Sequence, residues 1–284
     1  MKHGVEADLN ATITRNEDGT IRAITFTGKD SPPGTASAKS HVRRLADKIG
    51  LDITELNELD RNASHVEPKK TGPSFHLADK KSFFDTTTYV YDQTYLDTPV
   101  WGAGISVTLN DETGQILSIV NTSKVRIDAE LPAARDINRY RKLFCAGESG
   151  PAAEESRSKQ AISAAASQLT EILGSSLEGT GKGKQRATPE LISGRFYVHQ
   201  LDRAKRQHDH PEPSEEQEYP AETHEHEDLP TLPLPVLSDS LVDGSWHLVA
   251  ELVIRLPYQG HKMNWRLLVN VSTDEILYLR ALTS

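Results

Sequence analysis

The amino-acid sequence predicts an α+β protein built from two related modules, each an antiparallel sheet packed against an amphipathic helix. Several segments alternate apolar and polar residues with the period of two that is typical of half-buried strands. Two other segments carry apolar residues at the three- and four-residue spacing of an amphipathic helix. The strings at 104–122 and 264–283 also resemble each other, which indicates an internal repeat.

The N-terminal segments predict a hairpin followed by a helix. Residues 11–15 and 21–27 are rich in Ile and Thr, and the Asp-Gly pair between them is a strong turn signal. The helix should begin near Thr35 or Ser37, and Gly50 suits its C-terminal cap. Its apolar stripe consists of Val42, Leu45, Ala46 and Ile49.

Residues 60–82 are polar, contain two Pro residues and show no clear period, so we expect a connecting loop there. The stretch 88–120 then predicts the central strands of the first module. Tyr89, Tyr91 and Tyr95 fall at alternate or near-alternate positions, and the apolar residues of 105–109 alternate strictly with polar ones. A turn at 110–114 ends in a Gly that can take positive φ, which predicts a hairpin.

The corner inside this stretch carries a family resemblance. Tyr91-x-Gln93-x-Tyr95, followed by Pro99-Val100-Trp101-Gly102, resembles the "YxQxYxGxPVFG" signature in the propeptides of thermolysin-like and fungalysin-like zinc metalloproteases. Asp97 stands where that family usually has Gly, and Trp101 stands where it usually has Phe. The N-terminal hairpin, the helix string "RRLADKIGLD" and a Leu-x-x-Leu segment at 56–59 also resemble the opening of these propeptides.

The second half of the chain predicts helices and then strands. Helical spacing appears over 131–144 and 152–173, and residues 191–201 then predict a strand. Apolar residues occupy every second position of 246–256, which predicts a long antiparallel strand, and strands over 265–271 and 276–279 follow it. The string "WRLLVNVSTDEILYL" is similar to the PepSY-type domain of the same propeptides.

Together the resemblances imply two cystatin-like domains. Residues 1–128 are expected to form an FTP-like propeptide domain and 129–150 a helical connection. Residues 151–284 are expected to form a PepSY-like domain. Residues 202–235, rich in Pro, Glu and His, are expected to be a disordered insertion in that second domain.

Composition limits the classes of function. The 284 residues include 36% hydrophobic residues, enough for hydrophobic cores. Their formal net charge of −9 argues against a nucleic-acid partner. The single cysteine, Cys145, excludes an internal disulfide. No apolar run is long enough for a membrane span and no signal peptide begins the sequence, although the resembling propeptides are secreted. Localisation is therefore expected to be secreted by resemblance, or cytoplasmic, or exported by another route.

No catalytic constellation appears in the sequence, so we expect a protein that is not an enzyme. A zinc protease needs His-Glu-x-x-His, which is absent, and there is no Ser nucleophile motif or phosphate-binding Gly loop. The nearest string, at 224–227, lies in a Pro-rich stretch with His208 and His210 nearby. That stretch is either a solvated charged loop or a weak metal binder, so no metal ligands and no cofactor are assigned to this chain.

The resemblance implies a prosegment that helps a zinc metalloprotease to fold and inhibits it. Its partner would be the catalytic domain, in cis or in trans, and the zinc would belong to that partner. The alternative is a stand-alone PepSY-type adaptor without a protease. The expected partner-binding residues are Tyr91, Tyr95 and Trp101 at the corner, with a C-terminal tail laid into the partner's cleft, namely Leu279, Arg280, Ala281 and Leu282.

Overall fold

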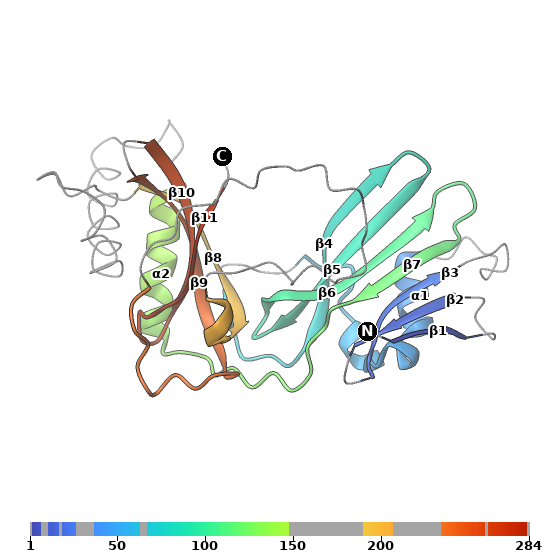
Figure 1. The fold of residues 1–284 in the computed structure, drawn as a ribbon, viewed down its shortest axis with the longest axis horizontal. Helices are drawn as coiled ribbons and strands as arrows, with labels where there is room; N and C mark the ends of the chain where they lie inside the picture. The colour runs from blue at the N-terminus through green and yellow to red at the C-terminus, as the bar shows by residue number, and fades with distance from the viewer. Residues whose placement is uncertain are drawn as a thin grey trace, which may run out of the picture. The chain divides into compact units, whose positions relative to one another are not determined.

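The computed structural model describes residues 2–6, 11–16, 19–26, 37–62, 67–147, 190–206, 234–258 and 261–282. The chain divides into two compact units, Met1–Ala129 (unit 1) and Glu130–Ser284 (unit 2). Antiparallel sheet dominates the described residues and two α-helices accompany it, so the predicted α+β class is confirmed (Figure 1).

Unit 1 contains an antiparallel sheet whose neighbouring strands follow the order β1-β2-β3-β7-β6-β5-β4. The strands are β1 (Lys2–Glu6), β2 (Ala11–Arg15), β3 (Ile21–Phe26), β4 (Ser74–Phe83), β5 (Thr86–Tyr95), β6 (Thr98–Asn110) and β7 (Ile116–Asn121). The expected hairpins β2–β3 and β6–β7 are both present, and β3 pairs with β7 to join them.

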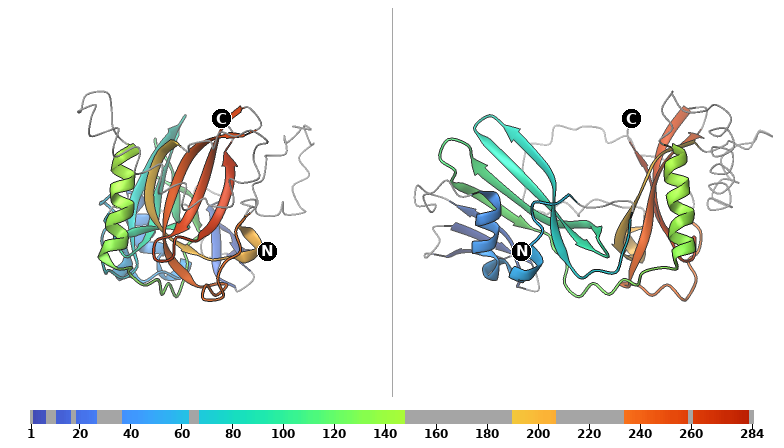
Figure 2. Two further views of the ribbon diagram at one scale, coloured as in Figure 1. Left: turned by 90° about the vertical axis from the view of Figure 1, so that its left-hand side faces the viewer. Right: turned by 180° about the vertical axis from the view of Figure 1, so that it is seen from behind.

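Helix α1 (Ala38–Leu45) packs against this sheet (Figure 2). Ser37 caps its N-terminus by accepting a hydrogen bond from the Ser40 backbone, and Gly50 ends the following turn with a φ of 75°. The buried face of the helix meets sheet residues in one hydrophobic core, and each fully buried large side chain contributes roughly 1.5–3 kcal/mol. The core residues from this segment are Ala38, Val42, Leu45, Ala46, Ile49, Leu51, Leu56 and Leu59.

Two strands of unit 1 differ from the expectation. Residues 74–83 form β4, although we expected a loop over 60–82, and residues 2–6 form β1 where no strand was expected. The residues in the second half of β4 are exposed on both faces, so this part of the strand carries no apolar period. Its backbone is ordered by pairing with β5 instead. The loop prediction is therefore wrong from Ser74 onwards.

Unit 2 contains the antiparallel meander β8-β9-β10-β11, which agrees with the strands expected over 191–201, 246–256, 265–271 and 276–279. Its strands are β8 (Glu190–Gln200), β9 (Trp246–Tyr258), β10 (His261–Asn270) and β11 (Ile276–Leu282). The even-numbered residues of β9 from Leu248 to Leu256 are all buried, as the alternating pattern predicts.

Helix α2 (Ala134–Gly147) covers one face of this second sheet by packing on β8. The Phe144 ring meets Phe196 edge-to-face at 4.8 Å between centroids. Gly194 allows this contact, because a Cβ at that position would lie 2.2 Å from the Phe144 ring. The buried residues of the helix are Ile137, Tyr140, Leu143 and Phe144.

The segment expected to connect the domains thus supplies the helix that covers the second sheet. The structure places the division at Ala129, and α2 belongs to unit 2. The helix expected over 152–173 and most of the insertion expected over 202–235 lie outside the described residues. Within the described ranges, neither helix has the length and apolar character needed to cross a membrane.

Candidate functional site

The motif that resembles the propeptides forms the corner between β5 and β6, and its small residues are required by close backbone packing. The pairing of these strands shifts register between Asp92 and Thr94, so the strands carry a bulge. A Cβ on Gly104 would lie 2.3 Å from the Tyr91 carbonyl oxygen, so only glycine fits there. Gly102 adopts a φ of +66°, which side-chain-bearing residues rarely adopt.

Gln93, the central residue of the motif, forms hydrogen bonds with the backbone of Lys124 in the segment that follows β7. Its Nε2 donates to the Lys124 carbonyl at 2.8 Å, and the Lys124 backbone N–H donates to its Oε1 at 2.7 Å. The Gln93 side chain is only 2% exposed. Both ends of the amide are therefore satisfied, and the residue has a structural role rather than a recognition role.

The turn between β5 and β6 explains why Asp can replace the usual Gly. Leu96 and Asp97 both have positive φ, 56° and 54°, which is the conformation of a two-residue type I′ hairpin turn. Asp tolerates this conformation better than most residues. Its carboxylate also lies 2.7 Å from the Lys69 ammonium, and the Lys69 backbone N–H donates to the Leu96 carbonyl at 3.0 Å.

The expected partner-binding residues separate into buried and half-buried groups. Tyr91 is 4% exposed within the core, and burial raises the pKa of its phenol to about 12. Tyr95 and Trp101 are half-buried at the corner. The expected tail is not a free segment, because Leu279 to Leu282 form the end of β11 and pair with β10. Leu279 and Ala281 are buried, whereas Arg280 and Leu282 are half-buried.

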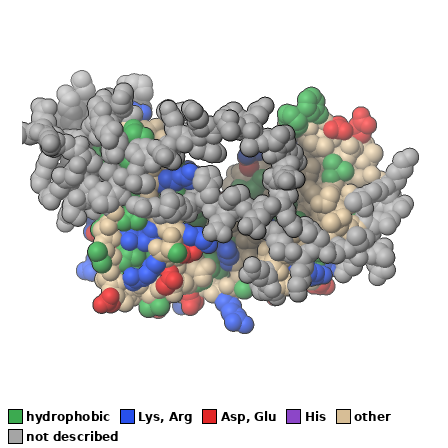
Figure 3. Space-filling view, viewed as in Figure 1, with side chains coloured by type: hydrophobic (Ala, Val, Ile, Leu, Met, Phe, Trp, Pro, Cys, Tyr) green, Lys and Arg blue, Asp and Glu red, His purple; other side chains and the backbone are tan. Residues whose placement is uncertain are grey.

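A strongly exposed aromatic pair lies at the opposite end of strand β5, where β5 forms a second hairpin with β4. Phe83 and Phe84 occupy the β4–β5 turn with 71% and 89% of their surface exposed, and their rings meet edge-to-face at 4.3 Å. Hydrophobic side chains gather at this end of the hairpin in Figure 3. The pair could not be predicted from the sequence, because it lies at the end of a strand that carries no apolar period.

Three metal-ligating side chains also meet beside the corner. Glu58, His76 and Asp97 each offer a ligand atom within 4.8 Å of the others, and His76 Nε2 lies 3.3 Å from a Glu58 oxygen. Burial lowers the pKa of His76, which outweighs the opposing effect of the two carboxylates. These residues lie in three separate segments with no recognisable spacing, so their proximity could not be predicted from the sequence.

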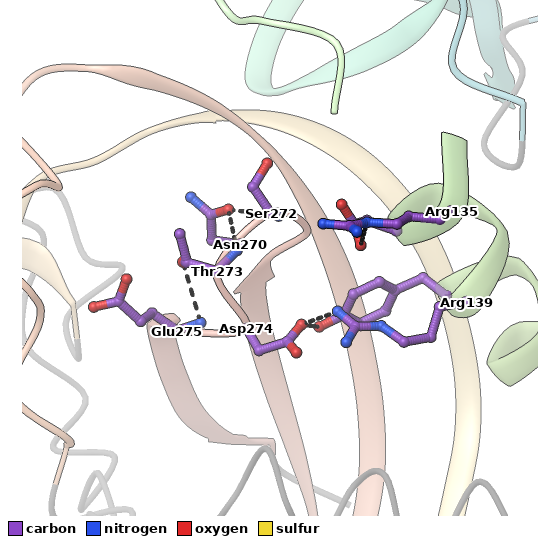
Figure 4. Close-up of polar contacts among 9 residues, drawn as sticks. Arg135, Arg139, Asn270, Ser272, Thr273, Asp274 and Glu275 are labelled. Carbon is purple, nitrogen blue, oxygen red and sulfur yellow. Dashed lines mark hydrogen bonds and ion pairs between the residues drawn. The ribbon is translucent and has the colours of Figure 1, made fainter. Parts of the chain in front are cut away.

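In unit 2, a tight turn receives side chains from α2. Asn270 Oδ1 accepts hydrogen bonds from the backbone N–H groups of Ser272 and Thr273, at 2.8 and 3.2 Å (Figure 4). Asp274 has a φ of 62°, and its carboxylate accepts a hydrogen bond from the Tyr140 hydroxyl at 2.7 Å and pairs with Arg139. Burial, followed by the bond to Asp274, raises the pKa of Tyr140.

The turn at 110–115 of unit 1 has the same construction. Asn110 Oδ1 accepts from the Thr113 backbone at 2.9 Å, and Gly114 has a φ of 64° at the position of Asp274. In both turns the Asn N–H and carbonyl make matching bonds: Asn110 with Gln115 and Gly114, Asn270 with Glu275 and Asp274, all at 2.9 Å. Helix α1 also reaches this residue, because the His41 ring lies 3.3 Å from the Gly114 carbonyl.

Glu275, which follows Asp274 in the unit 2 turn, forms hydrogen bonds with Ser238 in the segment before β9. Its carboxylate accepts from the Ser238 backbone at 2.6 Å and from the Ser238 hydroxyl at 3.1 Å. Partial burial opposes ionisation, but these bonds and the Thr273 side chain together hold the pKa of Glu275 below its ordinary value.

Glu275→Gln is expected to lower the free energy of unfolding by about 1 kcal/mol at pH 7, the size of a hydrogen bond to a partly exposed charged group. A depressed folded-state pKa stabilises the protein above the unfolded-state pKa, and this contribution is lost as pH falls through the folded value. The difference from wild type should therefore shrink between pH 6 and pH 3 in urea unfolding. Glu190→Gln, which removes a 63%-exposed carboxylate, is the control and should change little. A constant difference across this range would contradict the assignment.

The other face of the second sheet carries a charged cluster across three strands. Glu251 is 1% exposed in β9, and its carboxylate pairs with Arg195 of β8 and with Arg266 of β10, the latter at 2.9 Å. Lys and Arg side chains are prominent on the face of unit 2 visible in Figure 3. The cluster holds one buried negative charge between two partly exposed positive ones.

Comparison with known protein families finds no matching family model, and no curated protein matches either. Among solved structures, the C-terminal domain of Bacillus megaterium YpeB matches at 8% identity. The match covers 99% of this chain and 82% of that one, with a TM-score of 0.29. A likeness of this size is too low to establish a shared fold.

Proposed function

We propose that this chain is a non-catalytic, protein-binding prosegment whose partner is the catalytic domain of a thermolysin-like or fungalysin-like zinc metalloprotease. The partner would be joined to the chain or separate from it, and would hold the zinc. The prosegment would assist folding of the catalytic domain by binding its native form, and would inhibit it in the bound state. Secretion is part of this proposal and rests on the resemblance alone.

The observation that carries the proposal is the β4–β5 hairpin, which exposes two aromatic rings at its turn. Strand β5, which carries the Tyr-x-Gln-x-Tyr motif, is one of the two strands of this hairpin. At the end of β5 away from the turn, the Gln93 side chain is hydrogen-bonded to Lys124, and Gly104 packs closely against the Tyr91 backbone. Phe83 and Phe84 project from the other end. Aromatic side chains on a pre-ordered element are typical anchors of protein interfaces, because little conformational entropy is lost on binding.

A finer feature of the proposal is that both units are copies of one cystatin-like module. The turns at 110–115 and 270–275 share their Asn-centred bonds and a left-handed fifth residue, and a helix contacts that residue in each case. This supports an FTP-like domain over 1–128 and a PepSY-like domain in the remainder. Of the residues expected to bind the partner, Tyr95, Trp101, Arg280 and Leu282 stay in the proposal because their side chains are not fully buried.

Replacing both Phe83 and Phe84 by Ser is expected to weaken inhibition of a responsive thermolysin-like or fungalysin-like protease about 100-fold. Anchor residues of an interface contribute about 2 kcal/mol or more each to the binding free energy, and their effects are not additive. The inhibition constant is measured by titrating the chain against each protease with a fluorogenic peptide. Val125→Ser removes a 69%-exposed apolar side chain elsewhere in unit 1 and is the matched control. Equal inhibition by the double variant and the wild type would remove the aromatic pair from the interface.

The alternative function is a stand-alone adaptor of the PepSY type that binds a protein other than a protease. The adaptor function would be favoured if every protease tested stayed fully active in the presence of a micromolar excess of the chain. Sequencing the natural product across position 284 separates the two functions independently. A continuation that contains His-Glu-x-x-His would support the prosegment, and an unrelated continuation would support the adaptor.

A further inference from the structure

We propose that Glu58, His76 and Asp97 form a zinc-class metal site that fastens the β5–β6 corner to the segment before β4. The three residues come from three separate places: Glu58 follows the 3-10 helix η3 (Ile53–Leu56), His76 lies in β4, and Asp97 lies in the β5–β6 turn. Their ligand atoms all lie within 4.8 Å of one another. This site does not depend on the proposed function.

His76 is buried and directs one ring nitrogen toward the two carboxylates. The residue is 1% exposed, and within the described residues neither ring nitrogen makes a well-aligned hydrogen bond. The Nε2 atom lies 3.3 Å from Glu58 Oε2, within ion-pair distance but poorly aligned for a hydrogen bond, and the Arg61 backbone also lies close to the ring. Buried polar atoms are nearly always well satisfied, so a buried imidazole nitrogen that meets a carboxylate without a good hydrogen bond indicates a missing ligand. A metal ion bound at Nε2 would supply it.

The types of ligand atom at the site favour zinc and chemically similar ions. One imidazole and two carboxylates are the ligand types that zinc and its neighbours bind, whereas calcium and magnesium prefer oxygen alone. Ligand atoms around a tetrahedral zinc ion lie about 3.4 Å apart, given bonds of about 2.1 Å. The His76–Glu58 separation of 3.3 Å already matches this spacing, and the Asp97 ligand atom lies within 4.8 Å of the other two. Three protein ligands leave the fourth position for water.

The negative charge of the two carboxylates also favours a divalent cation at the site. Two carboxylates face the site, and they are now balanced by Arg61 at 2.6 Å from Glu58 and Lys69 at 2.7 Å from Asp97. Both cationic side chains are largely exposed, 61% and 59%, so each can turn into solvent when a divalent cation takes its place. Glu58 is itself 39% exposed and offers the route of entry.

Zinc binding is tested on the full chain after removal of metal with a chelator. The histidines of the insertion are alternative ligands for added zinc, so all four, His208, His210, His224 and His226, are replaced by Gln in the background protein. Titration calorimetry with zinc chloride is expected to show one equivalent bound at micromolar affinity or better. Cobalt(II) in place of zinc should give the intense visible absorption of a tetrahedral site.

Asp97→Asn and His76→Asn are the deciding variants, each expected to weaken zinc binding at least 30-fold and to abolish the cobalt spectrum. Asp97→Asn should stay folded, because Asn tolerates positive φ as well as Asp does. Its circular dichroism and unfolding midpoint without zinc should match the background protein, so a loss of binding cannot come from unfolding. His41→Asn, which alters a buried histidine away from the cluster, should leave zinc binding unchanged. Absence of one-equivalent binding in the folded background protein, or unchanged affinity in Asp97→Asn, would overturn the proposal.

Discussion

Gly104→Ala is expected to destabilise unit 1 by about 3 kcal/mol, the upper part of the range for overpacking a well-packed site. The added Cβ would lie 2.3 Å from the Tyr91 carbonyl oxygen and 3.3 Å from its carbonyl carbon. Both are backbone atoms of the paired strand, so no rotamer change can relieve the contact. The strands must separate locally, which breaks ladder bonds around the bulge. Urea unfolding followed by tryptophan fluorescence and by hydrogen exchange in β5 and β6 measures the loss.

Gly102→Ala separates this steric effect from a conformational one. Gly102 has a φ of +66°, but nothing lies within 4 Å of a Cβ built there. The expected cost is about 1 kcal/mol, the usual penalty for a side chain in the left-handed region. The two alanine variants lie two residues apart in one strand, so their difference reports the contact with Tyr91. Equal losses would show that the strand moves to accommodate the extra methyl group.

The fold could be predicted from sequence wherever one face of a strand is buried and the other is not. Strand β9 carries strict apolar alternation and has nearly the expected bounds. In β6 the alternation predicted only residues 105–109, and the strand also includes residues 98–104, which were expected to form a corner. Strand β4 has no such pattern beyond Leu77, because it lies at the edge of the sheet with both faces exposed. Its order comes from backbone pairing with β5, which leaves no trace in side-chain hydrophobicity.

The candidate sites were less predictable because they depend on which residues meet in space. The alternating tyrosines correctly predicted a strand, but alternation could not tell which ring faces the core, and Tyr91 is buried. Residues 276–279 are buried on both faces, so a segment expected to end as a free tail continues as a sheet strand. The Glu58–His76–Asp97 cluster joins three segments through tertiary structure alone.

The double variant Arg195→Leu/Arg266→Leu is expected to destabilise unit 2 by about 4 kcal/mol, because it leaves the Glu251 carboxylate buried and unpaired. Glu251 is 1% exposed, whereas the side chains of Arg195 and Arg266 are 44% and 30% exposed. Removing the two exposed partners therefore costs more than removing the buried one. Glu251→Leu alone should cost less, since both guanidinium groups can reach water.

The triple variant, which adds Glu251→Leu to the two arginine substitutions, is expected to recover most of the lost stability. A buried charge that has lost its partners is the costly species, and an apolar residue of similar size removes it. Chemical denaturation of the wild type, the double variant, the triple variant and Glu251→Leu completes the comparison. If the triple variant is as unstable as the double, the loss comes from the packing of the two arginine stems. In that case Glu251 would be a tolerated charge whose pairing contributes little to the stability of the sheet.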